Sequence, residues 1–134
     1  MECVMDHIVI NMEDDDRMIR FYSEILMLAP ERLDEYRAGR APFPSVRISA
    51  DTIIDLFPRK MWKQTAPAGP GRENLDHFCL SMPRQEWEAL LKRLEAAGVE
   101  IEEGPARRWG ALGMGTSVYF RDPERNLIEA RRYE

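Results

Sequence analysis

MDHIVINM (residues 5–12) and LDHFCLSM (residues 75–82) are two versions of one phrase, and their recurrence decides the fold. Asp6 and Asp76 stand 70 residues apart, and the following His and the later Met keep that same offset. The positions between them are apolar or small, as in a β-strand. The chain has 2 histidines in all, one in each phrase. An internal repeat is therefore the first expectation.

A helix pattern follows each phrase. Acidic residues 13–16 suit a helix N-terminus, where carboxylates face the positive end of the helix dipole, and Gly98 suits the position just past a helix end. Two apolar stripes have the spacing of one helix face. The stripes are Met18, Phe21, Tyr22, Ile25 and Leu26 in the first copy and Trp87, Leu90, Leu91, Leu94 and Ala97 in the second.

Three short strand-like stretches follow each predicted helix. They are residues 31–37, 44–49 and 52–57 in the first half, and residues 99–103, 116–120 and 126–132 in the second. Each half therefore reads βαβββ, which predicts an α+β fold. We expect a single domain over residues 1–134, with module one at about 1–58, a linker rich in Pro and Gly at about 59–73, and module two at about 74–134. Each module alone would leave one sheet face bare, so the two curved, mixed sheets are expected to enclose a cavity.

Strand alternation predicts where the histidines point. Side chains alternate across a strand, so His7 shares a face with Val9 and Asn11, while the apolar residues between them face the helix. In the second phrase His77 shares its face with Cys79. Both histidines are therefore expected on the sheet face away from the helices.

The last strand of each half adds a carboxylate to an otherwise apolar run, Asp55 in TIIDLFP and Glu129 in NLIEARR. Two histidines and two carboxylates, one pair per repeat, are donors that suit a divalent cation. Taken singly, His7 or His77 could be an ordinary core or surface residue, and Asp55 could bond the backbone near a turn. Glu129 is harder to explain as structure, because an unpaired buried carboxylate is costly.

The composition narrows the class of partner. A net charge of −5 disfavours a nucleic-acid or anionic-membrane surface, since phosphates are met by clustered Lys and Arg. No stretch approaches the roughly 20 apolar residues of a membrane span, and no secretory segment is recognisable. Cys3 and Cys79 are too few for a disulfide framework and fit a reducing compartment. We expect a cytoplasmic protein with a small-molecule partner, no nucleic acid and no membrane.

These phrases resemble the vicinal oxygen chelate superfamily, which includes glyoxalase I, extradiol ring-cleaving dioxygenases, fosfomycin-modifying thiol transferases and bleomycin-binding proteins. The likeness is carried by DHIVINM, RFYSEIL, LDHFCLSM and YFRDPERNLIEARRY, which together span the chain. The closing run is particularly similar to glyoxalase-domain proteins whose ends read DPDRNLIE.

The resemblance implies a metal site. In that superfamily one His and one acid from each module meet at a single divalent cation, and carried over position by position these are His7, Asp55, His77 and Glu129. The ion would be Ni, Zn, Mn, Co or Fe(II). The resemblance also implies paired βαβββ modules whose sheets enclose the metal, often within a homodimer.

Two positions depart from the glyoxalase I pattern. Asn11 stands where that enzyme commonly has an Arg for the glutathione carboxylate, which makes glutathione a doubtful cosubstrate. Asp55 stands where it has Glu, so the fourth ligand could be distant, water-bridged or absent. Without it, His7, His77 and Glu129 form the two-histidine, one-carboxylate set of non-haem Fe(II) oxygenases.

Several further residues are candidates for catalysis or binding. Glu129 is the candidate catalytic base, because its longer stem would let it swing off the metal. Residues 109–115, with three glycines, could form a lid over the site or a plain flexible turn. The candidate substrate-binding residues are Phe57, Cys79, Trp109 and Tyr119. The aromatic ones, like Trp62, could equally serve packing, and Cys79 could be a small strand residue. Arg107, Arg108 and Arg121 could hold an anionic group or belong to a solvated face.

The leading functional hypothesis is a metal-dependent, glyoxalase I-like lyase or isomerase acting on a small oxygen-rich substrate. An extradiol ring-cleaving dioxygenase with Fe(II) is the second enzymatic hypothesis. A non-catalytic protein that binds a drug or metabolite, as bleomycin-resistance proteins do, is the alternative from another class. A fosfomycin-type thiol transferase is disfavoured, since the chain has no run of Lys, Ser and Arg suited to a phosphonate or K⁺ loop.

Overall fold

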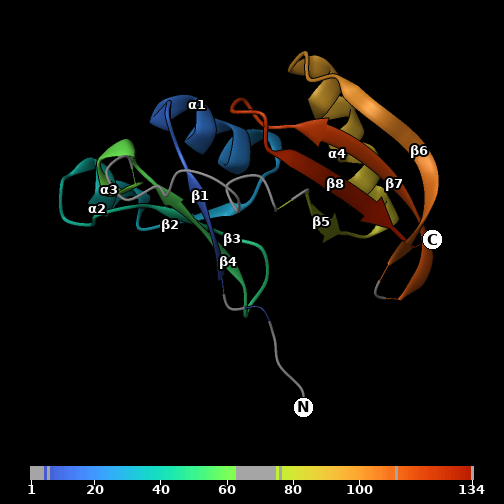
Figure 1. The fold of residues 1–134 in the computed structure, drawn as a ribbon, viewed down its shortest axis with the longest axis horizontal. Coiled ribbons are helices and arrows are strands. Elements are labelled where there is room, and N and C mark those ends of the chain that lie inside the picture. The colour runs from blue at the N-terminus through green and yellow to red at the C-terminus, as the bar shows by residue number, and fades with distance from the viewer. Residues whose placement is uncertain (1–4, 6, 63–74, 76, 111, 134) are drawn as a thin grey trace. The chain divides into compact units, whose positions relative to one another are not determined.

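The chain divides into two compact units, Met1–Pro67 and Ala68–Glu134 (Figure 1). This computed structural model describes residue 5, residues 7–62, residue 75, residues 77–110 and residues 112–133. Within these described residues, no helix has the length and apolar character needed to cross a membrane.

The first unit is built on a four-stranded mixed sheet (Figure 1). The strands lie in the order β1-β4-β3-β2, with β1 parallel to β4 and the other pairs antiparallel. Its elements in chain order are β1 (His7–Asn11), α1 (Asp15–Arg20), the π-helical turn η1 (Phe21–Ile25), β2 (Ala29–Glu31), α2 (Leu33–Arg37), β3 (Ser45–Arg47), β4 (Ile53–Phe57) and α3 (Arg59–Trp62).

The second unit has the same sheet topology, with strand order β5-β8-β7-β6 and β5 parallel to β8. The antiparallel strands β6 and β7 form a long hairpin (Figure 1). Its elements are β5 (Phe78–Ser81), α4 (Arg84–Ala96), β6 (Ile101–Gly110), β7 (Gly113–Arg121) and β8 (Leu127–Arg132). The predicted α+β fold of two βαβββ modules is confirmed.

The helix layer of the first unit begins where the acidic run predicted. Asp14 is the N-cap of α1, and its Oδ1 accepts a hydrogen bond of 3.1 Å from the Arg17 backbone N–H. Apolar side chains of the helix and of one sheet face then form the core. Its fully buried members include Met12, Met18, Tyr22, Ile54 and Leu56.

The helix layer of the second unit is α4. Of the predicted apolar stripe, the side chains of Trp87, Leu90 and Leu94 are buried and Leu91 is half-buried, whereas Ala97 lies past the end of α4 and is exposed. The Trp87 indole N–H donates to the Ala130 carbonyl at 2.9 Å and so ties α4 to β8. Gly98 has a φ of +71° just beyond the helix end, as the sequence predicted, because this left-handed conformation favours glycine. The apolar face of the second sheet is thereby covered.

The prediction of a strand over residues 31–37 is wrong for most of that stretch. β2 ends at Glu31, Arg32 adopts a φ of +58°, and the following residues form α2. The left-handed turn at Arg32 breaks the extended chain, and Tyr36 in α2 donates a hydrogen bond to Asp15. Residues 59–62 of the predicted linker are helical in α3, and residues 63–73 lie outside the described residues.

The β6–β7 hairpin is longer than predicted. Pairing continues from Ile101 with Phe120 out to Trp109 with Met114 and Gly110 with Gly113. In the glycine-rich stretch 109–115, Trp109 and Gly110 of β6 thus pair with Met114 and Gly113 of β7, and Ala111 lies outside the described residues.

Candidate functional site

Both histidines lie on the strand face that the alternation predicted. In β1, His7, Val9 and Asn11 are exposed, whereas Ile10 is buried. His77 immediately precedes β5, in which exposed residues again alternate with a buried one. The helices cover the apolar faces, so the histidines belong to the polar faces of their sheets.

Glu129 occupies the middle of the polar face of the second sheet. In the strand register it stands opposite Cys79 of β5 on one side and Tyr119 of β7 on the other. Its side chain is buried, with 4% of the residue exposed. A carboxylate in such a place requires partners, because burying an unpaired charge is strongly unfavourable.

One of these partners is His77. The His77 Nε2 atom lies 3.1 Å from Oε2 of Glu129. The Tyr119 ring meets the His77 ring edge to face, with 5.6 Å between the centroids. The predicted histidine and carboxylate of the second repeat are therefore in direct contact.

The other oxygen of Glu129 is held by two donors. The Ser117 hydroxyl donates to Oε1 at 2.6 Å, and the Arg131 Nη2 atom donates to the same oxygen at 2.9 Å. Arg131 is itself buried, with 3% of the residue exposed. Oε1 is therefore occupied by Ser117 and Arg131, whereas Oε2 faces His77.

These contacts decide the protonation state of Glu129. Burial raises the pKa of its carboxyl group, but hydrogen bonds from Ser117 and Arg131, the Arg131 charge and the His77 contact lower it by more. The net pKa lies below the usual value of 4.5. Glu129 is thus ionised at neutral pH, which is the state that a metal ligand requires.

Asp55 is the counterpart in the first unit. In the register it stands between Val9 of β1 and Ser45 of β3, and 8% of it is exposed. The Ser45 hydroxyl donates to Asp55 Oδ1 at 2.6 Å. His7 lies on the same sheet face, at the start of β1. Each sheet thus carries a histidine and a serine-bonded carboxylate on its polar face.

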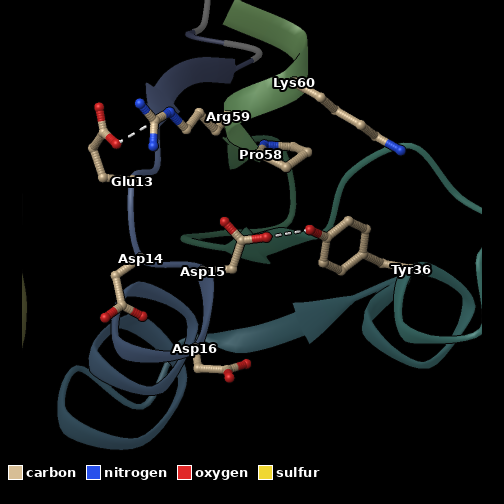
Figure 2. A pocket seen from close by; sticks show the side chains of 8 residues that line it. All are labelled: Glu13, Asp14, Asp15, Asp16, Tyr36, Pro58, Arg59 and Lys60. Carbon is tan, nitrogen blue, oxygen red and sulfur yellow. Dashed lines mark hydrogen bonds and ion pairs between the residues drawn. The ribbon is translucent and has the colours of Figure 1, made fainter. Parts of the chain in front are cut away.

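An open cavity of about 600 Å³ lies elsewhere in the first unit, near the start of α1 (Figure 2). Figure 2 shows Arg59 paired with Glu13, 3.5 Å apart, and Tyr36 donating a hydrogen bond to Asp15. Burial and this contact with Asp15 raise the pKa of Tyr36 to about 12. The lining residues are Glu13, Asp14, Asp15, Asp16, Tyr36, Pro58, Arg59 and Lys60. Among the described residues, no predicted site residue lines this cavity, so it does not belong to the candidate site.

The sequence model of the glyoxalase/bleomycin resistance protein/dioxygenase superfamily matches residues 4–130. The chain belongs to this superfamily. It is 33% identical over 129 residues to the virulence protein STM3117 of Salmonella typhimurium, covering 96% of this chain and 83% of that protein. The crystal structure of that protein matches with a TM-score of 0.75 and 26% identity, covering 100% of this chain and 99% of that chain.

Two further superfamily relatives carry more specific names. The glyoxalase domain-containing protein RDO1 of Mycosarcoma maydis is 32% identical over 133 residues, covering 97% of this chain and 68% of that protein. The metallothiol transferase FosB of Shouchella clausii is 24% identical over 125 residues, covering 93% of this chain and 77% of that protein.

The four predicted ligands of this superfamily member divide as one histidine and one carboxylate per unit. Within the part of the chain that the structure describes, no group of three His, Cys, Asp or Glu side chains is close enough to hold a metal ion. The donor types in the second unit nevertheless suit one. A histidine nitrogen and a carboxylate oxygen are donors that a divalent cation takes, and His77 Nε2 and Glu129 Oε2 lie 3.1 Å apart.

The candidate substrate-binding residues fall in different places. Cys79 and Tyr119 flank Glu129 on the polar face of the second sheet. Phe57 lies at the end of β4, where its ring packs against Phe43 with centroids 4.8 Å apart. Trp109 is 79% exposed at the end of the β6–β7 hairpin. The structure therefore brings two of the four, Cys79 and Tyr119, next to the carboxylate.

The structure describes the surroundings of two further candidate residues, Trp62 and Cys79. The Trp62 indole N–H donates to the Met12 carbonyl at 3.1 Å, which gives it a packing role in the first unit. Cys79 is exposed rather than buried. Desolvation and the nearby Glu129 charge raise the pKa of its thiol to about 11, so the thiol is protonated at neutral pH.

Sequence reasoning missed Arg131, whose guanidinium contacts the candidate ligand Glu129. A signal was present, since residues two apart on a strand share a face and the run EAR places Arg131 beside Glu129. Of the arginines that the sequence did single out, Arg108 pairs with Glu103, and Arg121 Nε pairs with Glu102 at 2.8 Å.

Proposed function

We propose that this protein is a metal-dependent, glyoxalase I-like lyase or isomerase acting on a small oxygen-rich substrate. One divalent cation would be held by His7, Asp55, His77 and Glu129, with Ni, Zn, Mn, Co or Fe(II) as the candidates. The observation that carries the proposal is the buried, ionised Glu129, whose Oε2 lies 3.1 Å from His77 Nε2. Superfamily membership supports it.

The bound metal would supply Lewis-acid stabilisation of the negative charge that develops on substrate oxygens when a neighbouring carbon loses a proton. The protein's own residues supply the rest. Glu129 offers Oε2 as the proton acceptor, because Ser117 and Arg131 occupy Oε1. Cys79 and Tyr119, on either side of Glu129, would contact the substrate.

A second candidate function follows from the shorter side chain of Asp55. Asp55 is largely buried and its Oδ1 accepts a 2.6 Å hydrogen bond from Ser45, as Oε1 of Glu129 does from Ser117, but its side chain is one methylene shorter than that of Glu129, which weakens its case as a fourth ligand. A site of His7, His77 and Glu129 alone is the ligand set of non-haem Fe(II) oxygenases. An extradiol ring-cleaving dioxygenase is therefore the alternative.

Reconstitution with single metals tests the two candidates. The metal-free protein is loaded with Ni, Co, Mn or Zn in air, or with Fe(II) without oxygen. It is then assayed for isomerisation of a 2-oxoaldehyde hemithioacetal and for oxygen uptake with catechol. The isomerase proposal predicts turnover with several metals and no oxygen uptake. Oxygen uptake that depends on Fe(II) would select the dioxygenase.

The Glu129→Gln variant tests the role of the carboxylate. We expect it to lose turnover by at least about 100-fold, the typical contribution of a general base, while keeping part of its bound metal. Retained turnover would reject Glu129 as the proton acceptor. Tight binding of a drug or metabolite by metal-free protein, without turnover under any condition, would instead favour the non-catalytic binding protein.

The state of assembly and the cellular location stay predictions. A homodimer is proposed from the family resemblance, and sedimentation equilibrium of the metal-loaded protein tests it. The cytoplasmic location rests on the sequence features already given.

A further inference from the structure

Arg131 makes four hydrogen bonds from a buried position in β8. Nη2 donates at 2.9 Å both to Glu129 Oε1 and to the Trp109 carbonyl. Nε donates to the Ser117 hydroxyl and Nη1 to the Tyr133 hydroxyl, each at 3.3 Å. The guanidinium therefore connects the candidate metal ligand Glu129 to the end of the β6–β7 hairpin.

The absence of a side chain at Gly110, at the end of β6, leaves space for this guanidinium. A Cβ atom at Gly110 would lie 1.6 Å from Arg131 Nη1, so a larger residue there would displace the guanidinium. The Leu112 backbone N–H donates to the Tyr133 hydroxyl at 3.1 Å, which joins the turn to the same cluster. The glycine at position 110 thus has a specific structural reason.

We propose that Arg131, seated by the end of the β6–β7 hairpin, is a positioning residue that fixes the Glu129 carboxylate and leaves only Oε2 available towards His77 and a metal ion. The role towards the metal rests on the proposed function. The fixed carboxylate itself is a property of the metal-free protein, and the two can be tested apart.

These hydrogen bonds bear on the expectation, drawn from the sequence, that the Glu129 side chain swings off the metal. A carboxylate that swings off the metal would have to break the Ser117 and Arg131 hydrogen bonds to Oε1. With Oε1 held, Oε2 is the oxygen of Glu129 that would face a metal ion or accept a substrate proton.

A simple charge-balancing role for Arg131 makes a different prediction. Lysine would balance the Glu129 charge equally well, but its ammonium group is a point charge without the planar fork of a guanidinium. A single Nζ atom cannot reach Glu129, the Ser117 hydroxyl and the Tyr133 hydroxyl together, as the Nη2, Nε and Nη1 atoms of Arg131 do. If positioning matters, Arg131→Lys behaves like Arg131→Met, whereas charge balance alone predicts that Lys restores the wild-type behaviour.

The first experiment uses metal-free protein and needs no activity. The chain has 2 histidines, so ¹⁵N signals of both imidazole rings can be assigned with a His7→Gln variant. We expect Arg131→Met, Arg131→Lys and Gly110→Ala each to shift the His77 ring signals, because the released Glu129 carboxylate leaves its position near Nε2. Gly110→Ala keeps Arg131 in the chain and serves as the second variant should Arg131→Met not fold.

Two variants are matched controls. Arg132→Met removes the same charge one residue away, where the guanidinium lies 5.0 Å from the Trp87 ring centroid. Leu112→Ala alters the hairpin turn at a side chain that is exposed. Both should leave the His77 signals unchanged. Unchanged His77 signals in Arg131→Met and Gly110→Ala as well would overturn the proposal, and so would restoration of the wild-type signals by Arg131→Lys.

The second experiment measures Co(II) affinity by competition with a chromophoric chelator, together with the visible spectrum of the bound ion. Loss of an outer partner of a metal ligand typically lowers affinity by about 10–100-fold. We expect that loss and an altered Co(II) spectrum in Arg131→Met, but not in Arg132→Met. Equal affinity and spectrum would refute the metal-related part. If the wild type takes up no Co(II), the proposed function fails, and the imidazole signals still decide whether Arg131 fixes Glu129.

Discussion

Glu129 is buried yet ionised because the residues around it donate hydrogen bonds to one of its two oxygens. Ser117 and Arg131 stabilise the carboxylate form and outweigh the penalty of burial. The same contacts that make Glu129 a suitable ligand therefore also link its protonation to the stability of the fold.

The lowered pKa predicts that acid destabilises the metal-free protein through Glu129. Its pKa in the folded state lies below 4.5, so the unfolded state binds the proton first as the pH falls. The stabilising contribution is complete above about pH 4.5 and is lost as the pH falls through the folded-state pKa. We expect the free energy of unfolding in urea to fall less between pH 6 and pH 3 (roughly) in Glu129→Gln than in the wild type. An exposed variant, Glu95→Gln, is the control, and an equal fall in Glu129→Gln and wild type would contradict the account.

The raised pKa of Cys79 predicts that its thiol reacts slowly with alkylating reagents at neutral pH. With a pKa of about 11, the thiolate fraction at pH 8 is roughly 100-fold below that of an ordinary cysteine. In a Cys3→Ser background, alkylation by iodoacetamide should be slower by about that factor in the folded protein than in urea, and should accelerate towards pH 11. Equal rates in the folded and unfolded protein would show that the thiol is not perturbed.

For single residues, strand alternation was enough to predict which sheet face His7 and His77 occupy. Alternation is a local property, and the exposed and buried positions of β1 follow it. The contacts of Arg131 could not be predicted in the same way. Its partner Trp109 lies 22 residues upstream, and the contact exists because the β6–β7 hairpin is long enough to bring it there.

At the scale of elements, α4 covers one face of the second sheet. Its buried stripe covers the apolar face, and this leaves the opposite face for His77, Cys79 and Glu129. Stability and site thus belong to opposite faces of the same sheet.

Because the core and the candidate site lie on opposite faces of this sheet, a substitution in the core of α4 should lower the free energy of unfolding without changing the candidate site. Leu94→Ala removes a fully buried side chain of α4 and should lower the free energy of unfolding by about 2–5 kcal/mol. Leu91→Ala, at a half-buried position of the same helix, is the matched control and should cost less. Urea unfolding of the two variants checks the order, and equal losses would contradict the assigned core.

The boundaries of the elements were predicted less well than the βαβββ order, and the short helices α2 and α3 were not predicted. The sequence of residues 31–37 is compatible with both a strand and a helix. In the structure, Arg32 adopts a left-handed conformation and the residues that follow it form α2. The ends of β6 and β7 contain Gly, Pro and Arg, which are poor strand formers or neutral. Cross-strand pairing, which a local pattern does not encode, extended both strands to Gly110 and Gly113.

For the whole molecule, the repeat was the decisive signal, because the same order of strands and helix appears twice and produces the same sheet topology in each unit. The proposed metal site depends on residues from both copies. A His and a carboxylate in each unit are local features, whereas a single site built from all four depends on the association of the units, which local sequence patterns do not encode.

Asp55 is the predicted metal ligand whose role decides between the two proposed functions. If it is a ligand, Asp55→Ala should weaken Co(II) binding by more than the roughly 10–100-fold typical of an outer partner. Ser45→Ala, which removes the donor to Asp55 Oδ1, is the matched variant and should have the smaller effect. Unchanged affinity in Asp55→Ala would leave His7, His77 and Glu129 as the ligands and favour the Fe(II) dioxygenase.

The most direct test of the central claim is the metal content of gel-filtered protein after reconstitution, measured for the wild type, His7→Ala and His77→Ala. A single ion shared by the two repeats predicts about one ion per chain in the wild type, and loss of that ion in either variant alone. Wild-type protein without metal under every condition, or one histidine variant that keeps its full metal content, would contradict a site shared by both repeats.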